Sequence, residues 1–138
     1  MKISRIDVTV INVSFVAPIR WSGGANEDWT RIIVEMHTDD GLVGLGETLG
    51  GKVTAALIET EIAPMFLGES PFAIEKMLSK ATFVPLYYGK AGYCAIAALE
   101  VACWDLMGKA TGRPVCELIG GRLREEVPFA AYIYHRNN

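Results

Sequence analysis

The sequence predicts an α+β fold in which a three-stranded antiparallel meander precedes a helical bundle. Apolar residues alternate with polar ones in the first 47 residues, which is the period of a half-buried strand. Asp40 and Gly41 separate two such runs, as in a tight hairpin turn. From residue 53 onward, apolar residues recur at helical spacing. With 138 residues and a 51% hydrophobic fraction, the chain can form one globular core.

The three strands are predicted at about residues 3–13, 30–38 and 42–47. In the first strand the apolar positions change parity after Val10, which a one-sided strand permits only through a bulge or a change of neighbour. The glycine-rich stretch Gly44–Gly51 follows the hairpin turn without the spacing of a phosphate loop. It favours close backbone approach and a flexible turn.

A long loop is predicted between the first two strands, over Ser14–Trp29. Loops of more than about 12 residues are uncommon in compact domains and are often lids or binding loops. Trp21 and Trp29, with Arg20 and Asn26, could cover and hydrogen-bond a polar, anionic ligand. Alternatively, the two tryptophans fill the domain's own core, and the residues favour neither reading.

Helices are predicted at about residues 53–63, 71–81 and 91–109. Pro64 is expected to stop the first helix, and Ser70 to cap the second with Pro71 at its first position. The third is apolar nearly all round, and such a helix needs burial on more than one side. This indicates a missing layer, either a second domain or another subunit.

Several classes of function and location are excluded by composition. A net charge of −3 without a basic run argues against nucleic-acid binding. Glu100 and Asp105 interrupt the longest apolar stretch, which argues against a membrane span. No signal-peptide core is recognisable. Cys94, Cys103 and Cys116 form no CxxC pair and no even framework, so free thiols and a cytoplasmic location are expected.

Structural roles are expected for two acidic residues of the third predicted helix and for the histidine of the second strand. Glu100 and Asp105 are five residues apart on one helix and therefore point about 140° apart, which makes a poor metal pair. Lys109 or Arg113 could pair with them. His37 lies in mid-strand and is expected to be a surface or core side chain. The sequence contains no recognisable nucleophile triad, HExxH, P-loop or GxGxxG motif.

The segment from Ala95 reads AIAALEVACWDLMGKATGRPVCELIGG. It resembles the signature of the mandelate racemase and muconate lactonizing enzyme branch of the enolase superfamily, and the strands before it agree in register. The resemblance covers the whole chain. Within that branch, the stretches PIRWS, HTDDGLVGLGET and VPFAAYIYHR are most similar to glucarate dehydratase and related acid-sugar dehydratases.

The resemblance implies that residues 1–121 form an N-terminal capping domain. Residues 122–138 would be a linker and the first strand, at 127–134, of a (β/α)-barrel whose remainder is absent. Enzymes of this branch abstract a proton α to a carboxylate, and Mg²⁺ stabilises the enediolate. In the acid-sugar dehydratases, which are hydro-lyases, loss of water follows. Their bases and metal ligands lie on the barrel, so this segment alone is expected to be inactive, with no catalytic residue, metal ligand or bound Mg²⁺.

The capping domain of this family supplies a lid of two segments. Here they correspond to Val16–Trp29 and Thr48–Lys52, and the substrate-contact candidates are Arg20, Trp21, Asn26 and Lys52. Further candidates lie where the first barrel strand ends, since barrel active sites form at strand C-terminal ends: Tyr132, Tyr134 and His135. Glucarate dehydratase has a histidine in its first lid segment. None is present in this one, which argues against glucarate itself as substrate.

The expected partners are a small sugar-acid substrate, the missing barrel domain and further copies of the chain. Two alternatives stay open. One is a racemase, epimerase or cycloisomerase of the same superfamily. The other is a stand-alone, non-catalytic module that binds a small acid or mediates oligomerisation.

Overall fold

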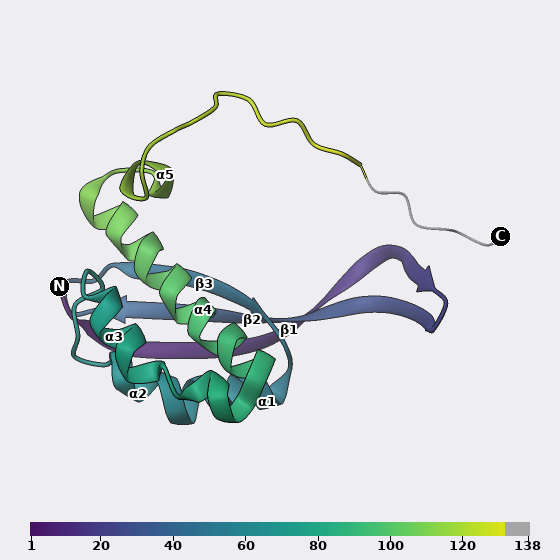
Figure 1. The fold of residues 1–138 in the computed structure, drawn as a ribbon, viewed down its shortest axis with the longest axis horizontal. Helices are drawn as coiled ribbons and strands as arrows, with labels where there is room; N and C mark the ends of the chain where they lie inside the picture. Colours follow the sequence, from purple (N-terminus) through teal and green to yellow (C-terminus); the bar gives the residue numbers. More distant parts are fainter. Residues whose placement is uncertain (132–138) are drawn as a thin grey trace.

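The computed structural model describes residues 1–131 and has a three-stranded antiparallel sheet followed by helices (Figure 1). The predicted fold class is therefore confirmed. In chain order, the elements are β1 (Ile3–Trp21), β2 (Gly24–Thr38), β3 (Val43–Leu49), α1 (Lys52–Leu57), the π-helical turn η1 (Ile58–Ile62), α2 (Ala63–Phe66), α3 (Ile74–Ala81), α4 (Val84–Thr111) and α5 (Val115–Leu118).

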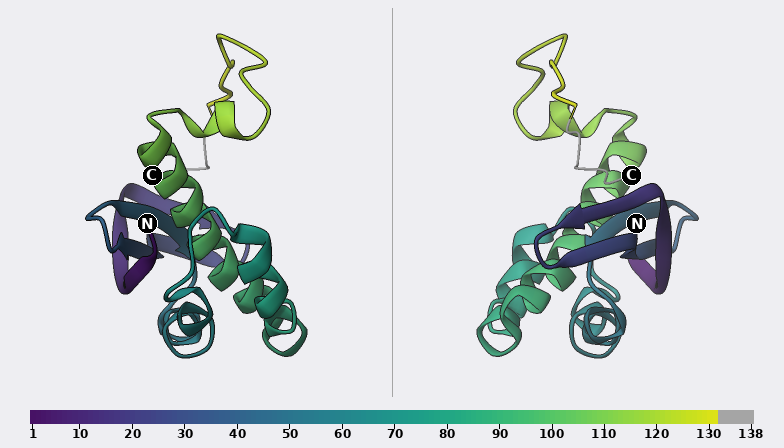
Figure 2. Two further views of the ribbon diagram at one scale, coloured as in Figure 1. Left: turned by 90° about the vertical axis from the view of Figure 1, so that its left-hand side faces the viewer. Right: turned by 90° about the vertical axis from the view of Figure 1, so that its right-hand side faces the viewer.

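The sheet has the order β1-β2-β3, with β2 in the centre. Ile32, Val34 and Met36 alternate along β2 and are fully buried, because they face the helical layer. Figure 2 shows that the helices gather on one face of the sheet. The core is formed between these two layers, and Phe66 and Leu99 are among its fully buried side chains.

The turn between β2 and β3 confirms the predicted hairpin. Gly41 has φ 88°, in the left-handed region that the Asp-Gly pair predicts. The Thr38 backbone N–H donates to the Leu42 carbonyl at 3.0 Å, and the Leu42 N–H donates to the Thr38 hydroxyl at 3.1 Å. These bonds fix the register in which His37 faces Val43.

The predicted loop Ser14–Trp29 is wrong, because this stretch continues both strands as a long hairpin. We call residues 14–28 the arm; it projects beyond the helical layer (Figure 1). Trp21 pairs with Gly24 across a two-residue turn, and Gly24 has φ 146°. Trp21 is 51% exposed and Trp29 44%, so the alternative that the tryptophans fill the core is also wrong.

The part of β1 in the arm could not be predicted as a strand, because it contains a proline and polar residues. Pairing breaks between Ser14 and Ile19, where residues 15–18 of β1 face residue 27 alone. Pro18, which has no N–H to donate, lies in this irregular segment. The bulge expected after Val10 is absent, since the register is continuous from Arg5 to Ser14. The parity changes there because Val10, Ile11 and Val13 are all more than one third exposed, so this part of β1 has no single buried face.

The helix predicted at 53–63 is three consecutive segments: α1, η1 and α2. Pro64 does not stop it. The wide π turn Ile58–Ile62 places this proline in the first turn of α2, where no backbone donor is needed. The buried side chains follow the predicted face, with Ile58 and Ile62 fully enclosed.

The helix predicted at 71–81 begins later, at Ile74. Ser70 is not its N-cap. The Ser70 carbonyl accepts the Ala73 N–H at 2.9 Å and its hydroxyl accepts the Phe72 N–H at 3.3 Å, so Ser70 and Pro71 form a turn before the helix.

The helix predicted at 91–109 is longer, because α4 runs over Val84–Thr111. Gly89, at φ 54° and ψ −131°, separates a first turn from the long helix, and Gly112 ends it in a left-handed cap. By length and composition α4 could cross a membrane, but half of that window is buried within the domain. One side carries the buried residues, whereas Tyr93 and Val101 are exposed, so residues 1–131 bury α4 on one side only.

The glycines of β3 have the predicted role of close backbone approach. A Cβ on Gly46 would collide with the Ala98 carbonyl, and one on Gly44 would collide with the Ala102 carbonyl and the Leu106 side chain at 2.5 Å. Strand and helix backbones therefore touch along this line.

The chain beyond α5 is extended and exposed as far as residue 131, and it leads away from the domain (Figure 1). The strand predicted at 127–134 is not formed over residues 127–131, where no neighbouring strand offers hydrogen bonds. Tyr132, Tyr134 and His135 lie outside the described residues. The helical turn after Pro114 is formed, as α5.

Candidate functional site

The two predicted lid segments leave the sheet at the same end. Leu49, the last residue of β3, pairs with Arg31 of β2. Trp29, at the base of the arm, comes two residues before Arg31 on the same strand. The arm and the segment Thr48–Lys52 are therefore neighbours at this end, although 20 or more residues separate them in sequence. We take this end of the sheet as the candidate site.

The arm sorts its candidate residues onto two faces. Trp21 pairs with Gly24 and Ile19 with Asn26, so Trp21 and Asn26 share a face. Arg20 has the opposite parity and lies on the other face. All three are exposed. Trp21 and Asn26 can thus contact one ligand together, and Arg20 cannot contact it from the same face.

An aromatic and charged stack forms the base of the arm. The rings of Phe15 and Trp29 meet edge to face, with centroids 5.4 Å apart. The Arg31 guanidinium lies over the Trp29 ring, with its Cζ 4.9 Å from the ring centroid. Its Nε forms an ion pair with Glu47 Oε1 at 3.2 Å. This stack could not be predicted from the sequence, because Phe15 and Trp29 fall in the stretch predicted as a loop.

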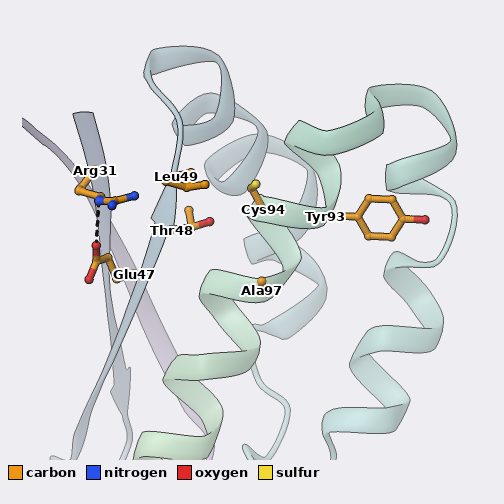
Figure 3. A pocket seen from close by; sticks show the side chains of 7 residues that line it. All are labelled: Arg31, Glu47, Thr48, Leu49, Tyr93, Cys94 and Ala97. Atoms are coloured by element: carbon orange, nitrogen blue, oxygen red, sulfur yellow. Dashed lines mark ion pairs between the residues drawn. The ribbon is translucent and has the colours of Figure 1, made fainter. Parts of the chain in front are cut away.

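A cavity of about 460 Å³ lies beside this stack, between β3 and α4 (Figure 3). The Arg31–Glu47 pair forms one side, and the Cys94 thiol faces Leu49 across the cavity, while Tyr93 points outward. Its lining residues are Arg31, Glu47, Thr48, Leu49, Tyr93, Cys94 and Ala97.

A second cavity of about 300 Å³ adjoins it, since both are lined by Leu49 and Cys94. Gly50, Thr54 and Lys90 contribute its polar groups. Lys52 begins α1 and is exposed beside this region. Lys90 was not among the sequence candidates, because it follows Gly89 outside the predicted helix.

Asp105 and Lys109 have a structural role at the outer edge of β3, as predicted. Asp105 Oδ2 accepts the Leu45 backbone N–H and the Lys109 ammonium, both at 2.7 Å. Lys109 also donates to the Val43 carbonyl at 2.7 Å. These contacts satisfy backbone groups of an edge strand that would otherwise be open to pairing.

Glu100 and Arg113 have other partners than the sequence suggested. Glu100 Oε1 accepts the Trp104 indole N–H at 3.4 Å, and Arg113 pairs with Glu117 at 3.2 Å.

Burial, with a smaller effect of the nearby Glu100 carboxylate, raises the pKa of the Cys103 thiol to about 12. All three cysteines are free.

The sheet face away from the helices carries a second charged group. His37 Nε2 lies 3.0 Å from Asp7 Oδ2, and Arg5 lies 3.1 Å from the same oxygen. Arg5 also approaches His37 Nε2 at 3.0 Å. His37 is half-buried and linked to the neighbouring strand, consistent with the structural role expected of it.

The described residues do not fit the magnesium ion that the resemblance implies. Within residues 1–131, no group of three or more His, Cys, Asp or Glu side chains is placed to hold a metal ion.

Comparison with known proteins agrees with this fold. The sequence pattern of the mandelate racemase / muconate lactonizing enzyme N-terminal domain matches residues 5–120. The chain belongs to this family. An enolase structure from Streptomyces coelicolor, provisionally named as a sugar isomerase, matches 93% of this chain with 48% identity and a TM-score of 0.88.

Two named relatives carry different activities. An N-succinyl-L-Arg/Lys racemase from Bacillus cereus is 34% identical over 93% of the chain, and its crystal structure has a TM-score of 0.79. A Caldivirga maquilingensis protein provisionally named L-rhamnonate dehydratase is 38% identical over 72% of the chain. A further family structure, from Roseovarius nubinhibens, is complexed with magnesium and is 31% identical over 99% of the chain, with a TM-score of 0.82.

In each case the capping domain corresponds to a minor part of the relative. The chain spans 36% of the racemase, 26% of the rhamnonate dehydratase relative and 34% of the S. coelicolor enolase. Family members are thus larger enzymes, of which dehydratases and racemases are both examples.

Proposed function

We propose that this chain is the substrate-covering cap of a magnesium-dependent acid-sugar dehydratase. The observation that carries the proposal is the common end of the sheet from which the arm and the Thr48–Lys52 segment both leave. A sugar acid is favoured because one relative is provisionally named for a sugar acid and one similar structure for a sugar. The dehydratase would abstract the proton α to the carboxylate and eliminate water.

The cap would bind and enclose the substrate, and residues outside this chain would carry out the chemistry. Trp21 would cover a sugar face and exclude water, and Asn26 beside it would hydrogen-bond a hydroxyl or carboxylate oxygen. Arg20 would act on the opposite face of the arm, against the barrel or a second ligand group. Lys52, at the other lid segment, supplies a cation for a carboxylate. Tyr132, Tyr134 and His135 stay candidates for the barrel side of the site.

A racemase of the same superfamily is the second candidate. The 34% identity to an N-succinyl-L-Arg/Lys racemase over nearly the whole chain favours it. Both reactions begin with abstraction of an α proton, so the cap could serve either.

The remaining parts of the proposal concern location and assembly. We expect a cytoplasmic enzyme, since three free cysteines suit a reducing compartment. We also expect it to assemble as a homo-oligomer together with its barrel.

The experiment that tests the function uses the protein that joins this cap to a barrel. It is incubated with Mg²⁺ and a panel of sugar acids and N-acylamino acids in D₂O, and the products are followed by proton NMR. Loss of water with a keto-deoxy acid as product supports the dehydratase. Deuterium at Cα without loss of water supports the racemase, and no reaction with any acid contradicts both.

A further inference from the structure

Arg31 contacts both lid segments, although it belongs to neither. Its guanidinium stacks on Trp29, the residue at the base of the arm, with Cζ 4.9 Å from the ring centroid. The Nε of the same group forms an ion pair at 3.2 Å with Glu47, which directly precedes the Thr48–Lys52 segment. The Arg31 side chain is only 21% exposed, so this geometry is held by its surroundings.

The arm needs such a support at its base. A two-stranded ribbon is marginally stable by itself, and here the pairing is interrupted between Ser14 and Ile19. The Trp29 ring lies at this interruption, in contact with Phe15 on one side and Arg31 on the other. The position of that ring therefore influences the direction in which the arm leaves the sheet.

The opposite end of the contact has a comparable role. Glu47 is 59% exposed, and its carboxylate pairs with Arg31 across the β2–β3 pairing (Figure 3). The residues that follow Glu47 line the larger cavity and lead into α1. Loss of the Arg31–Glu47 ion pair would therefore alter the position of the residues that begin the Thr48–Lys52 segment.

We propose that Arg31 is a positioning residue that couples the arm to the Thr48–Lys52 segment. A planar guanidinium can stack on a ring and donate to a carboxylate at once, which a lysine ammonium does less well. The two lid segments would then order together when either is held. The value of this coupling for substrate binding rests on the proposed function, but the coupling itself is measurable without substrate.

Amide hydrogen exchange tests the proposal, read by NMR on the 138-residue chain in a Val101→Lys background, which charges an exposed apolar position of α4 and favours the monomer. Glu47→Ala removes the acceptor on β3 and leaves the arm's own residues unchanged. We expect arm amides to exchange about threefold faster, as the loss of one weak ion pair and a weakened stack implies. In an Arg31→Ala background, Glu47→Ala should add nothing to arm exchange. Arg31→Lys should keep part of the protection at Thr48–Lys52 but lose it in the arm.

Glu35→Ala is the matched control, since Glu35 is an exposed carboxylate on the same face of β2. It should leave arm exchange unchanged, and the amides of Ile32 and Val34 report whether each variant keeps its core. If arm exchange in Glu47→Ala equals wild type while the core is intact, the coupling is refuted and the proposed function stands. If the coupling is measured but arm variants of the complete enzyme turn over normally, the role of the arm in substrate binding is refuted instead.

Discussion

Single residues determine how closely the sheet and the long helix approach. Gly46 has no space for a side chain, because the Ala98 carbonyl and the Ala102 methyl group occupy the position of its Cβ. The obstacle on the helix side includes backbone, which cannot rotate away. Close packing of β3 on α4 therefore depends on this position, and the depth of the neighbouring cavity depends on that packing.

For Gly46→Ala we expect a loss of about 1–3 kcal/mol in the free energy of unfolding, the usual cost of overpacking. Urea denaturation followed by circular dichroism measures it. Gly51→Ala is the control, because nothing lies within 4 Å of its Cβ position and its φ is negative. Alanine is a poorer N-cap than glycine, but it also lowers the entropy of the unfolded chain, so the net cost should be about 0.5 kcal/mol or less. Equal midpoints for the two variants would contradict the close approach.

Glu69 links α3 to the start of β1, because its carbonyl also accepts the Ile3 backbone N–H at 2.9 Å. Lys76 and Lys80 donate to its carboxylate at 2.8 and 2.7 Å, and these bonds lower its pKa from 4.5 to about 2. Because the folded-state pKa lies below the unfolded one, this stabilisation is complete above about pH 4.5 and is lost as the pH falls toward 2.

For Glu69→Gln we therefore expect a melting temperature that varies less with pH between 4.5 and 2 than in wild type. Thermal melts across this range measure the difference. The exposed Glu59→Gln serves as control and should follow the wild-type profile. A Glu69→Gln curve parallel to wild type would show that the two lysines do not act through this carboxylate.

At the scale of elements, the edges of the sheet are treated differently. The outer edge of β3 is covered by α4 through Asp105 and Lys109, whereas the arm extends β1 and β2 beyond the helical layer. The covered edge holds the body of the domain, and the uncovered hairpin is left free to contact another partner. Stability and proposed function are thus located at different places in one sheet.

For Asp105→Ala we expect a loss of about 1–3 kcal/mol in unfolding free energy, because the Leu45 N–H loses its acceptor and Lys109 its partner. Exchange of the Leu45 amide should also accelerate. Glu117→Ala removes an exposed ion pair with Arg113 and should cost under about 1 kcal/mol. If both variants unfold at the same urea concentration, the edge contact is not stabilising.

The body of the fold could be predicted from sequence, but the arm could not. Alternation and the Asp40-Gly41 turn are local signals, so β2, β3 and their register followed from the residues. Helix boundaries failed where a π turn and the Gly89 kink changed the hydrogen-bond pattern. The arm failed because Pro18 and Gly23 indicate a loop, while the pairing that overrides them joins residues of two strands.

Part of the candidate site could likewise be predicted from sequence and part could not. Trp21, Arg20 and Asn26 were found as candidates by residue type and resemblance, but their division between two faces required the strand register. Arg31 and Glu47 carry no motif, and their contact exists only in the folded sheet. Lys90 reaches the smaller cavity through a kink that no local pattern indicated.

At the scale of the whole molecule, many apolar side chains lie outside the core and are exposed. A groove of about 480 Å³ between β3, α4 and α5 is lined mostly by apolar side chains, and Trp104 and Val101 are among them. Trp21 and Val16 add exposed apolar area on the arm. Contiguous exposed apolar surface is uncommon on soluble monomers and usually has a partner.

When expressed alone, the 138-residue chain should therefore self-associate or have low solubility. Light scattering coupled to size exclusion measures its mass at rising concentration. We expect a dimer or larger species, and Val101→Lys, which charges the groove, should shift the population toward monomer. A single species of 15.1 kDa at high concentration would indicate a self-contained module.

The central claim is that the arm contacts substrate in the enzyme that carries this cap. Steady-state kinetics of Trp21→Ala in the complete, Mg²⁺-loaded protein tests it most directly, with Thr9→Ala, on an exposed position of β1, as control. We expect a rise in KM of about tenfold or a changed preference among sugar acids, with Thr9→Ala unchanged. Kinetic constants for Trp21→Ala equal to wild type on every substrate that the enzyme turns over would contradict the claim.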